Sequence, residues 1–144
     1  PAATPAIPRP VAHDLSALQI LCVDDEASIR DGMATLLSRW GCSVETTAKY
    51  NDALELISTG DFDVMIADLQ LKDVRTGLNL IQASRAHLTD PENVALLTAR
   101  ASEMVTETAQ GEDIALLRKP VNPDDLRVFL TRCAERRAAA QAAE

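Results

Sequence analysis

Short strand-like segments alternate with helix-like segments five times along this chain. Four of them are apolar runs, at residues 19–23, 62–67, 94–98 and 114–118, and residues 43–47 (SVETT) alternate weakly as a strand does. Between and after them, apolar residues recur every three to four positions, as Leu126, Phe129 and Leu130 do after the last run. Strands joined through helices make right-handed crossovers, so the strands are parallel and helices cover both faces of the sheet. The chain is therefore predicted to be an α/β protein with a doubly wound five-stranded parallel sheet.

The two ends of the chain differ in composition from the part between them. Residues 1–17 include PAATPAIPRP, which holds four of the seven prolines and favours an extended linker. Residues 138–144 are rich in alanine and are predicted to be a tail that continues the last helix. The folded domain is expected to span residues 18–137. Because the chain begins with Pro rather than Met, we expect a processed product or a segment of a longer protein.

Composition argues against several kinds of partner. The 22 Asp and Glu residues outnumber the 14 Lys and Arg residues, which gives a net charge of −8. Such a chain repels phosphate backbones, and with 3% aromatic residues it lacks a base-stacking surface, so no nucleic-acid binding is expected. No run of about 18 apolar residues is present, so we expect no membrane contact by this segment. The three cysteines form no CxxC pair and indicate reduced thiols in a cytoplasmic protein.

Polar side chains with a shared chemistry stand where the predicted strands end. Asp24 and Asp25 follow the first strand, Asp68 the third, Thr98 the fourth and Lys119 the fifth. The carboxyl ends of parallel strands meet at one edge of the sheet. Three carboxylates repel one another there unless a cation joins them, and oxygen ligands favour Mg²⁺. With a hydroxyl and an ammonium nearby, the pattern predicts a phosphoryl-transfer site that forms an aspartyl phosphate.

The motifs that carry these residues resemble the receiver domains of bacterial two-component response regulators. They are VDDE at 23–26, DVMIADLQL at 63–71, LLTA at 96–99 and LLRKPVNPDDL at 116–126, and the resemblance covers about residues 18–135. It implies the flavodoxin-like receiver fold. It also implies a phosphoprotein of a phosphorelay, in which Asp68 takes a phosphoryl group from a phosphohistidine donor. Such a domain is a signalling module and not an enzyme, with at most weak autodephosphorylation.

The resemblance further implies a Mg²⁺ site around the phosphoacceptor. Asp25 is expected to bind the ion directly, and Asp24 directly or through water. Asp68 and the backbone carbonyl of Gln70 would complete the protein ligands. Mn²⁺ could substitute for Mg²⁺.

The same resemblance implies a group that binds the phosphoryl oxygens and transmits the change. Thr98 would donate a hydrogen bond to the phosphoryl group and Lys119 would pair with its charge. The Lys119–Pro120 peptide is expected to be cis, which only a following proline makes credible. The signal would be a shift of the face around the fourth helix and fifth strand. The helix near residues 102–110 has the weakest apolar face in the chain, which suits an element that moves.

The chain also departs from the usual pattern of the family. Leu116, three residues before Lys119, stands where many receivers carry an aromatic side chain that swings inward on activation. We therefore expect weaker switching or switching through another element. The segment LQLKDVRTG after Asp68 lacks a proline often found there and is about one residue longer than usual. Gln70 and Arg100 occupy positions that tune dephosphorylation in the family.

The sequence leaves several contexts open for such a domain. The Pro/Ala-rich start and the closing RKPVNPDDLRVFLTR favour the C-terminal receiver of a hybrid sensor histidine kinase. The donor would then be its own kinase core, and a histidine phosphotransfer protein a further partner. A stand-alone response regulator, with a separate histidine kinase as donor, is the alternative, as is a receiver trimmed from a larger regulator. Homodimer formation is left open.

Two further readings belong to other functional classes. Phosphatases of the haloacid dehalogenase type also use an aspartyl phosphate, Mg²⁺, Thr and Lys. Their nucleophile follows the first strand in a DxD pattern, and Asp24-Asp25-Glu26 does not match it. The other reading is a receiver-like interaction module that works without phosphorylation. The complete acceptor set argues against that module, and failure to bind Mg²⁺ would favour it.

Overall fold

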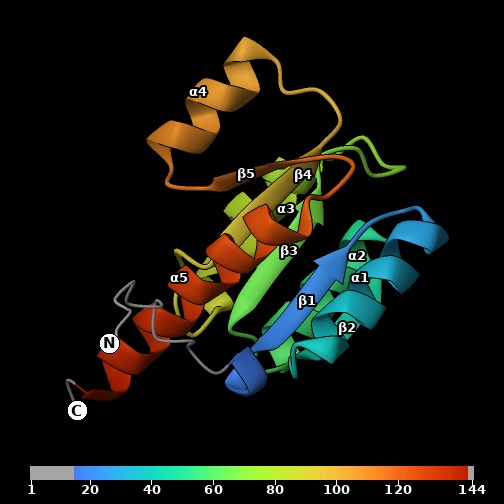
Figure 1. Ribbon diagram of the computed structural model, residues 1–144. Helices are drawn as coiled ribbons and strands as arrows, with labels where there is room; N and C mark the ends of the chain where they lie inside the picture. Colours follow the sequence, from blue (N-terminus) through green and yellow to red (C-terminus); the bar gives the residue numbers. More distant parts are fainter. Residues whose placement is uncertain (1–14, 143–144) are drawn as a thin grey trace, which may run out of the picture.

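A parallel sheet in the order β2–β1–β3–β4–β5 forms the centre of the computed structural model, which describes residues 15–142 (Figure 1). Its strands are β1 (Gln19–Val23), β2 (Ser43–Thr47), β3 (Val64–Asp68), β4 (Val94–Thr98) and β5 (Ala115–Arg118). The α-helices are α1 (Ala27–Arg39), α2 (Tyr50–Thr59), α3 (Gly77–Ser84), α4 (Glu103–Gly111) and α5 (Pro123–Ala142), with short 3₁₀ helices η1 (Leu15–Ala17) and η2 (Arg85–His87). The predicted doubly wound α/β fold is confirmed.

The pleat of the strands sends alternate side chains to two cores, one on each face of the sheet. Ile20 and Cys22 of β1 face the core that contains residues of α1 and α5. Leu21 and Val23 face the opposite core, which contains residues of α2, α3 and α4. β3 and β4 are buried along their whole length because both of their faces are covered. Burial on both faces explains why these strands read as continuous apolar runs in the sequence.

The order of the strands creates a switch point between β1 and β3. Residue Ile20 pairs with Val44 of β2 on one side and with Val64 of β3 on the other. The chain therefore leaves β1 toward β2 and later crosses back over β1 to form β3. In open α/β sheets, ligands bind beyond the carboxyl ends of the strands at such a point. The predicted site residues after β1 and at the end of β3 lie there.

Helix α4 is held more loosely than the other helices. Ser102 caps its first turn, since the Ser102 hydroxyl accepts a hydrogen bond from the Val105 amide at 3.1 Å. Ala109 is the one buried residue of this helix, all of which the structure describes, and Met104 is 76% exposed. In Figure 1, α4 lies at the β5 edge of the sheet. The weak apolar face that the sequence shows at 102–110 has this structural counterpart.

The N-terminal end of the folded part lies earlier than predicted. Leu15 is buried in the core on the α1–α5 face and residues 15–17 form a 3₁₀ helix, so ordered structure begins inside the predicted linker. Helix α5 continues to Ala142, so residues 138–142 continue the last helix as the sequence predicts. The rest of the predicted linker and tail lies outside the described residues. Across residues 15–142, no helix combines the length and apolar character that crossing a membrane requires.

Candidate functional site

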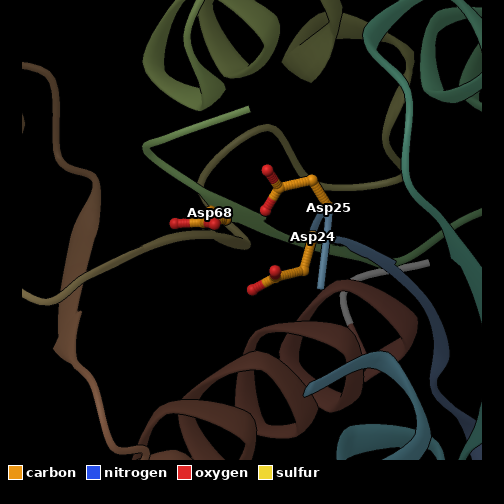
Figure 2. A group of neighbouring side chains, drawn as sticks. All are labelled: Asp24, Asp25 and Asp68. Carbon is orange, nitrogen blue, oxygen red and sulfur yellow. The ribbon is translucent and has the colours of Figure 1, made fainter. Parts of the chain in front are cut away.

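Three carboxylates meet at the carboxyl edge of the sheet. Asp24 and Asp25 lie just beyond β1, and Asp68 is the last residue of β3. Each offers an oxygen atom, and these atoms all lie within 4.8 Å of one another (Figure 2). Asp24 and Asp68 are buried, whereas Asp25 is partly exposed. The structure therefore brings together the three acidic residues that the sequence placed at strand ends.

Lys119 lies between two of these carboxylates. Its Nζ atom is 2.9 Å from Asp24 Oδ2 and 3.0 Å from Asp68 Oδ2. The Lys119 amide donates a hydrogen bond to the Thr98 carbonyl, which continues the pairing of β5 with β4 into the site. The Lys119–Pro120 peptide is cis, as predicted. The lysine therefore reaches the acidic cluster from the neighbouring end of the sheet.

The protonation of the cluster follows from burial and from these contacts. Burial raises the pKa of the Asp68 carboxyl, and the charge of Asp24 raises it further, against stabilising contacts from Lys119 and the Gln70 amide. Burial alone would lower the pKa of Lys119, but the hydrogen bonds and charges of both carboxylates outweigh it and the pKa is raised. Lys119 therefore stays protonated at neutral pH. Three carboxylates and one ammonium leave two negative charges uncompensated.

This donor set fits a divalent cation. All the offered ligand atoms are carboxylate oxygens, the donors that Mg²⁺ prefers. Asp24 Oδ2 is buried, and its close charged partner among the described residues is the Lys119 ammonium at 2.9 Å. A buried carboxylate is costly unless paired charges and hydrogen bonds complete it, and a cation or water would add to what Lys119 supplies. The two uncompensated negative charges match the charge of such an ion.

The residues that follow Asp68 make a tight turn at the site. The Gln70 amide donates to Asp68 Oδ1 at 3.2 Å, and the Leu69 amide donates to the Leu97 carbonyl at 2.8 Å. The backbone of this turn is therefore fixed by both the Asp68 side chain and the neighbouring strand. The Gln70 side chain is exposed.

The hydroxyl of Thr98 is engaged within its own loop. It accepts a hydrogen bond from the Arg100 amide at 3.1 Å and donates one to the Arg100 carbonyl. Thr98 is buried at the end of β4, next in the sheet to Asp68 at the end of β3. Arg100 is exposed. In this state the hydroxyl is therefore paired with backbone and is not a donor to Asp68.

Leu116 is partly buried on β5 and packs against the core on the α2–α4 face. The position that the sequence marked for its missing aromatic ring thus holds an ordinary apolar contact.

Two supporting residues were missed in the sequence. The Arg30 side chain donates from Nη1 to the Asp24 carbonyl at 2.8 Å, which holds the turn after β1. A Cβ atom on Gly77 would lie 2.0 Å from the Asp68 carbonyl oxygen, so a glycine is needed for this approach. The glycine at the start of a predicted helix was a signal for close packing. No spacing along the chain signals the Arg30 contact.

The fold and this edge of the sheet together define a class of signalling domain. The model of the family described as "response regulator receiver domain" matches residues 20–131. The chain belongs to this receiver family. As predicted, it is a receiver domain of the two-component type, which is a signalling domain.

Curated relatives are bacterial regulators. The chain is 32% identical over 113 residues to the transcriptional regulatory protein DltR of Streptococcus agalactiae, covering 76% of this chain and 48% of DltR. It is 30% identical over 115 residues to the response regulator protein PilR of Pseudomonas aeruginosa, covering 78% of this chain and 25% of PilR. The chain thus spans half or less of the length of these two relatives.

Solved structures show the same fold. A CheY-like response regulator receiver domain protein from Methanospirillum hungatei has a TM-score of 0.75 and 25% identity, covering 85% of this chain and 98% of that one. The chemotaxis protein CheY4 of Vibrio cholerae has a TM-score of 0.68 and 29% identity, covering 81% and 98%. These similarities confirm the receiver fold that the sequence motifs implied.

Proposed function

We propose that this domain is a phosphoacceptor in two-component signal transduction. Asp68 takes a phosphoryl group from a phosphohistidine donor, with Mg²⁺ as the cofactor. The observation that carries the proposal is the meeting of Asp24, Asp25 and Asp68, with Lys119 Nζ placed between Asp24 and Asp68. Membership of the receiver family supports the same chemistry.

Asp24, Asp25 and Asp68 would hold the metal ion, with the Gln70 backbone carbonyl as a fourth ligand. The partly exposed Asp25 is suited to bind directly, and buried Asp24 directly or through water. Mn²⁺ has similar ligand preferences and could substitute. When bound, the ion offsets the charge of the carboxylates and of the incoming phosphoryl group.

Asp68 acts as the nucleophile in this proposal. One oxygen of its carboxylate forms a bond to phosphorus while the phosphorus–nitrogen bond of the donor breaks. The electron pair of the broken bond returns to the donor imidazole. Lys119 and the Gln70 amide favour the ionised form of Asp68 that this attack requires. Lys119 also lies close enough to pair with the charge of the new phosphoryl group.

Thr98 and its loop would respond to the new phosphate. Its hydroxyl must release the Arg100 carbonyl before it can donate to a phosphoryl oxygen. That exchange would move the segment between β4 and the loosely held α4. The face around α4 and β5 is then the output, with Leu116 in place of a rotating aromatic ring. Gln70 and Arg100, both exposed beside the site, are proposed to tune the rate of a weak autodephosphorylation.

The parent protein is also a matter of proposal. The resemblance of both chain ends to hybrid histidine kinases favours a kinase parent in the cytoplasm, whose core would be the donor and a phosphotransfer protein the next acceptor. The curated relatives are regulators, so a response regulator with a separate donor kinase is the second candidate. The two parents can be distinguished by isolating the native protein with an antibody against this domain. A kinase parent should phosphorylate itself on histidine, and a regulator parent should not.

The domain itself is proposed to occupy about residues 18–137, with Leu15 packed against its core. We also propose that this segment contacts neither nucleic acid nor a membrane.

Intact mass after incubation with Mg²⁺ and acetyl phosphate tests the proposal. Wild type is expected to gain one phosphoryl group, and Asp68→Asn none. Asp61→Asn is the matched control because Asp61 is exposed and lies outside the acidic cluster, so it should be phosphorylated normally. EDTA should abolish the adduct in wild type and in Asp61→Asn.

Two results would contradict the proposal. Equal labelling of wild type and Asp68→Asn would exclude Asp68 as the acceptor. No labelling of wild type, by acetyl phosphate or by phosphorylated histidine kinases, together with no heat of Mg²⁺ binding, would favour the phosphorylation-independent module.

A further inference from the structure

The segment of residues 69–76, called here the acceptor loop, connects β3 to α3 and carries Gln70. Its base is closed by a hydrogen bond from the Gly77 amide to the Leu69 carbonyl at 3.0 Å. Leu69 and Leu71 are buried and anchor the first half of the loop. The second half lacks a buried apolar anchor, because its apolar residue, Val74, is 97% exposed.

Arg75 links the outer half of the acceptor loop to another element. It pairs with Asp73 through two hydrogen bonds, from Nε to Oδ1 at 3.0 Å and from Nη2 to Oδ2 at 2.9 Å. Its guanidinium carbon lies 3.9 Å from the centre of the Tyr50 ring. Tyr50 is the first residue of α2 and is buried. The guanidinium is thus held between its own loop and a fixed ring.

A cavity separates the acceptor loop from the segment that leads into α2. It has a volume of about 260 Å³, and Asp25, Tyr50, Leu71 and Asp73 are among the residues that line it. Direct packing does not fill this space, so the loop could move into or away from it. The stacking of Arg75 on Tyr50 spans the two sides and opposes that movement.

We propose that Arg75 is a positioning residue that orders the acceptor loop for Mg²⁺ binding. The inference rests on the proposed function, in which the Gln70 carbonyl is a ligand of the ion. A ligand on a mobile loop must be ordered when the ion binds, and that ordering weakens the affinity. A loop already held by Arg75, Asp73 and Tyr50 avoids most of this penalty.

Calorimetric titration with Mg²⁺ alone tests the inference on the full chain. Arg75→Ala is expected to raise the Kd for Mg²⁺ about two- to fivefold, which is the factor that an exposed cation–π contact and ion pair are worth. Tyr50→Leu keeps the apolar bulk and removes the ring face, so it should weaken Mg²⁺ binding by the cation–π part of that factor. The double variant should bind Mg²⁺ no more weakly than Arg75→Ala alone, because both substitutions remove the same stacking contact. Tyr50→Phe keeps the ring and should bind as wild type does.

Arg127→Ala is the matched control for loss of a surface arginine stacked on a ring. Arg127 lies 5.1 Å from the centre of the Trp40 ring and belongs to α5, outside the acceptor loop. Its loss should leave the Kd for Mg²⁺ unchanged. Melting without Mg²⁺ reports whether Arg75→Ala acts through global unfolding. Arg75→Lys, which keeps the cation but loses the paired contacts to Asp73, should fall between wild type and Arg75→Ala.

The outcomes separate this inference from the proposed function. If wild type shows no Mg²⁺ binding, the proposed function itself fails. If wild type binds the ion, and both Arg75→Ala and Tyr50→Leu bind it with the wild-type Kd, the positioning role is overturned while the proposed function stands. Additive losses in the double variant would show that Arg75 and Tyr50 act separately, which also overturns it.

Discussion

At the scale of single residues, the candidate site is defined by charge that the fold buries at a cost. Asp24 and Asp68 are almost fully buried, and burial is the main reason that the pKa of Asp68 is raised. Lys119 offsets this only in part. A stable core would not select such an arrangement, because like charges in proximity oppose folding. The arrangement favours binding of a cation and an incoming phosphoryl group.

Asp68→Asn should therefore stabilise the metal-free protein at neutral pH while it abolishes phosphorylation. A raised pKa means that folded Asp68 holds its proton more tightly than unfolded Asp68. In wild type this group's contribution makes the free energy of unfolding fall as pH rises from the unfolded pKa through the folded pKa. Below both pKa values the contribution is neutral, so the difference between variants should shrink near pH 4. Urea titrations in EDTA at pH 4 and pH 7 measure this.

The predicted gain at pH 7 needs a control for amide substitution in general. Asp61→Asn changes an exposed carboxylate and should show no such dependence on pH. An Asp68→Asn protein that is less stable than wild type at pH 7 without Mg²⁺ would contradict the assigned cause of the pKa shift.

At the scale of secondary-structure elements, α3 must start very close to the end of β3. The first residue of α3 is Gly77, and a side chain there would collide with the Asp68 carbonyl oxygen. Thr76 caps the helix, since its hydroxyl accepts from the Asn79 amide at 3.2 Å and the Asn79 side-chain oxygen accepts from the Thr76 amide at 2.9 Å. This capping box and the glycine together place the helix start directly behind Asp68.

Gly77→Ala should lower the free energy of unfolding by at least about 2 kcal/mol and weaken Mg²⁺ binding. Its Cβ would lie 2.0 Å from a backbone oxygen, so either the helix or Asp68 must shift. The matched control is Gly32→Ala in α1, where no atom lies within 4 Å of the added Cβ. That change should stabilise the protein by about 0.5–1 kcal/mol, because alanine favours a helix interior over glycine. Denaturant unfolding of both variants gives the comparison, and a neutral Gly77→Ala would refute the packing argument.

At the scale of the whole molecule, α5 runs from the carboxyl ends of the strands, where the acidic cluster lies, to their amino ends (Figure 1). Near its far end, Arg137 donates to the buried carboxylate of Asp63 at 2.6 Å. Asp63 also accepts from the Gln19 amide at 2.8 Å and from the Thr89 hydroxyl at 2.7 Å. One carboxylate therefore joins the start of β1, the loop before β4 and the C-terminal helix. Asp63 lies just before β3, at the opposite ends of the strands from the acidic cluster, so its contacts stabilise the fold.

Asp63→Ala should destabilise the protein by about 2–3 kcal/mol without changing the Kd for Mg²⁺. Its loss leaves three donors without their acceptor and Arg137 without its counter-charge, and the partial exposure of Arg137 keeps the loss at the lower end for such pairs. Asp61→Ala, two residues away and exposed, should change stability by less than about 0.5 kcal/mol. Thermal melting and calorimetry separate the two effects. An altered Mg²⁺ affinity in Asp63→Ala would show that this contact communicates with the acceptor edge.

The alternation of apolar runs with helical patterns was enough to predict the sheet and its layers. This prediction succeeds because β3 and β4 are buried on both faces, so each of them is a continuous apolar run that can be recognised in the local sequence. The strand ends could be placed for the same reason, so Asp24, Asp68 and Thr98 were found as polar residues that interrupt buried runs. The limits of the fold were harder to read. Leu15 looks like part of a Pro-rich linker until the core that covers it is known.

What the sequence determined by itself is the class of fold and the set of chemical groups at its carboxyl edge, because both follow from local patterns of burial and polarity. Only the tertiary structure decided how those groups are held. The Arg30 contact with Asp24, the approach of Gly77 to Asp68 and the stacking of Arg75 on Tyr50 depend on which backbone passes near which side chain. The Asp63 carboxylate also bonds to Gln19, which is 44 positions away in the chain, and to Arg137, which is 74 positions away. Contacts of that kind are set by chain crossing and packing in three dimensions, and no periodicity along the sequence encodes them.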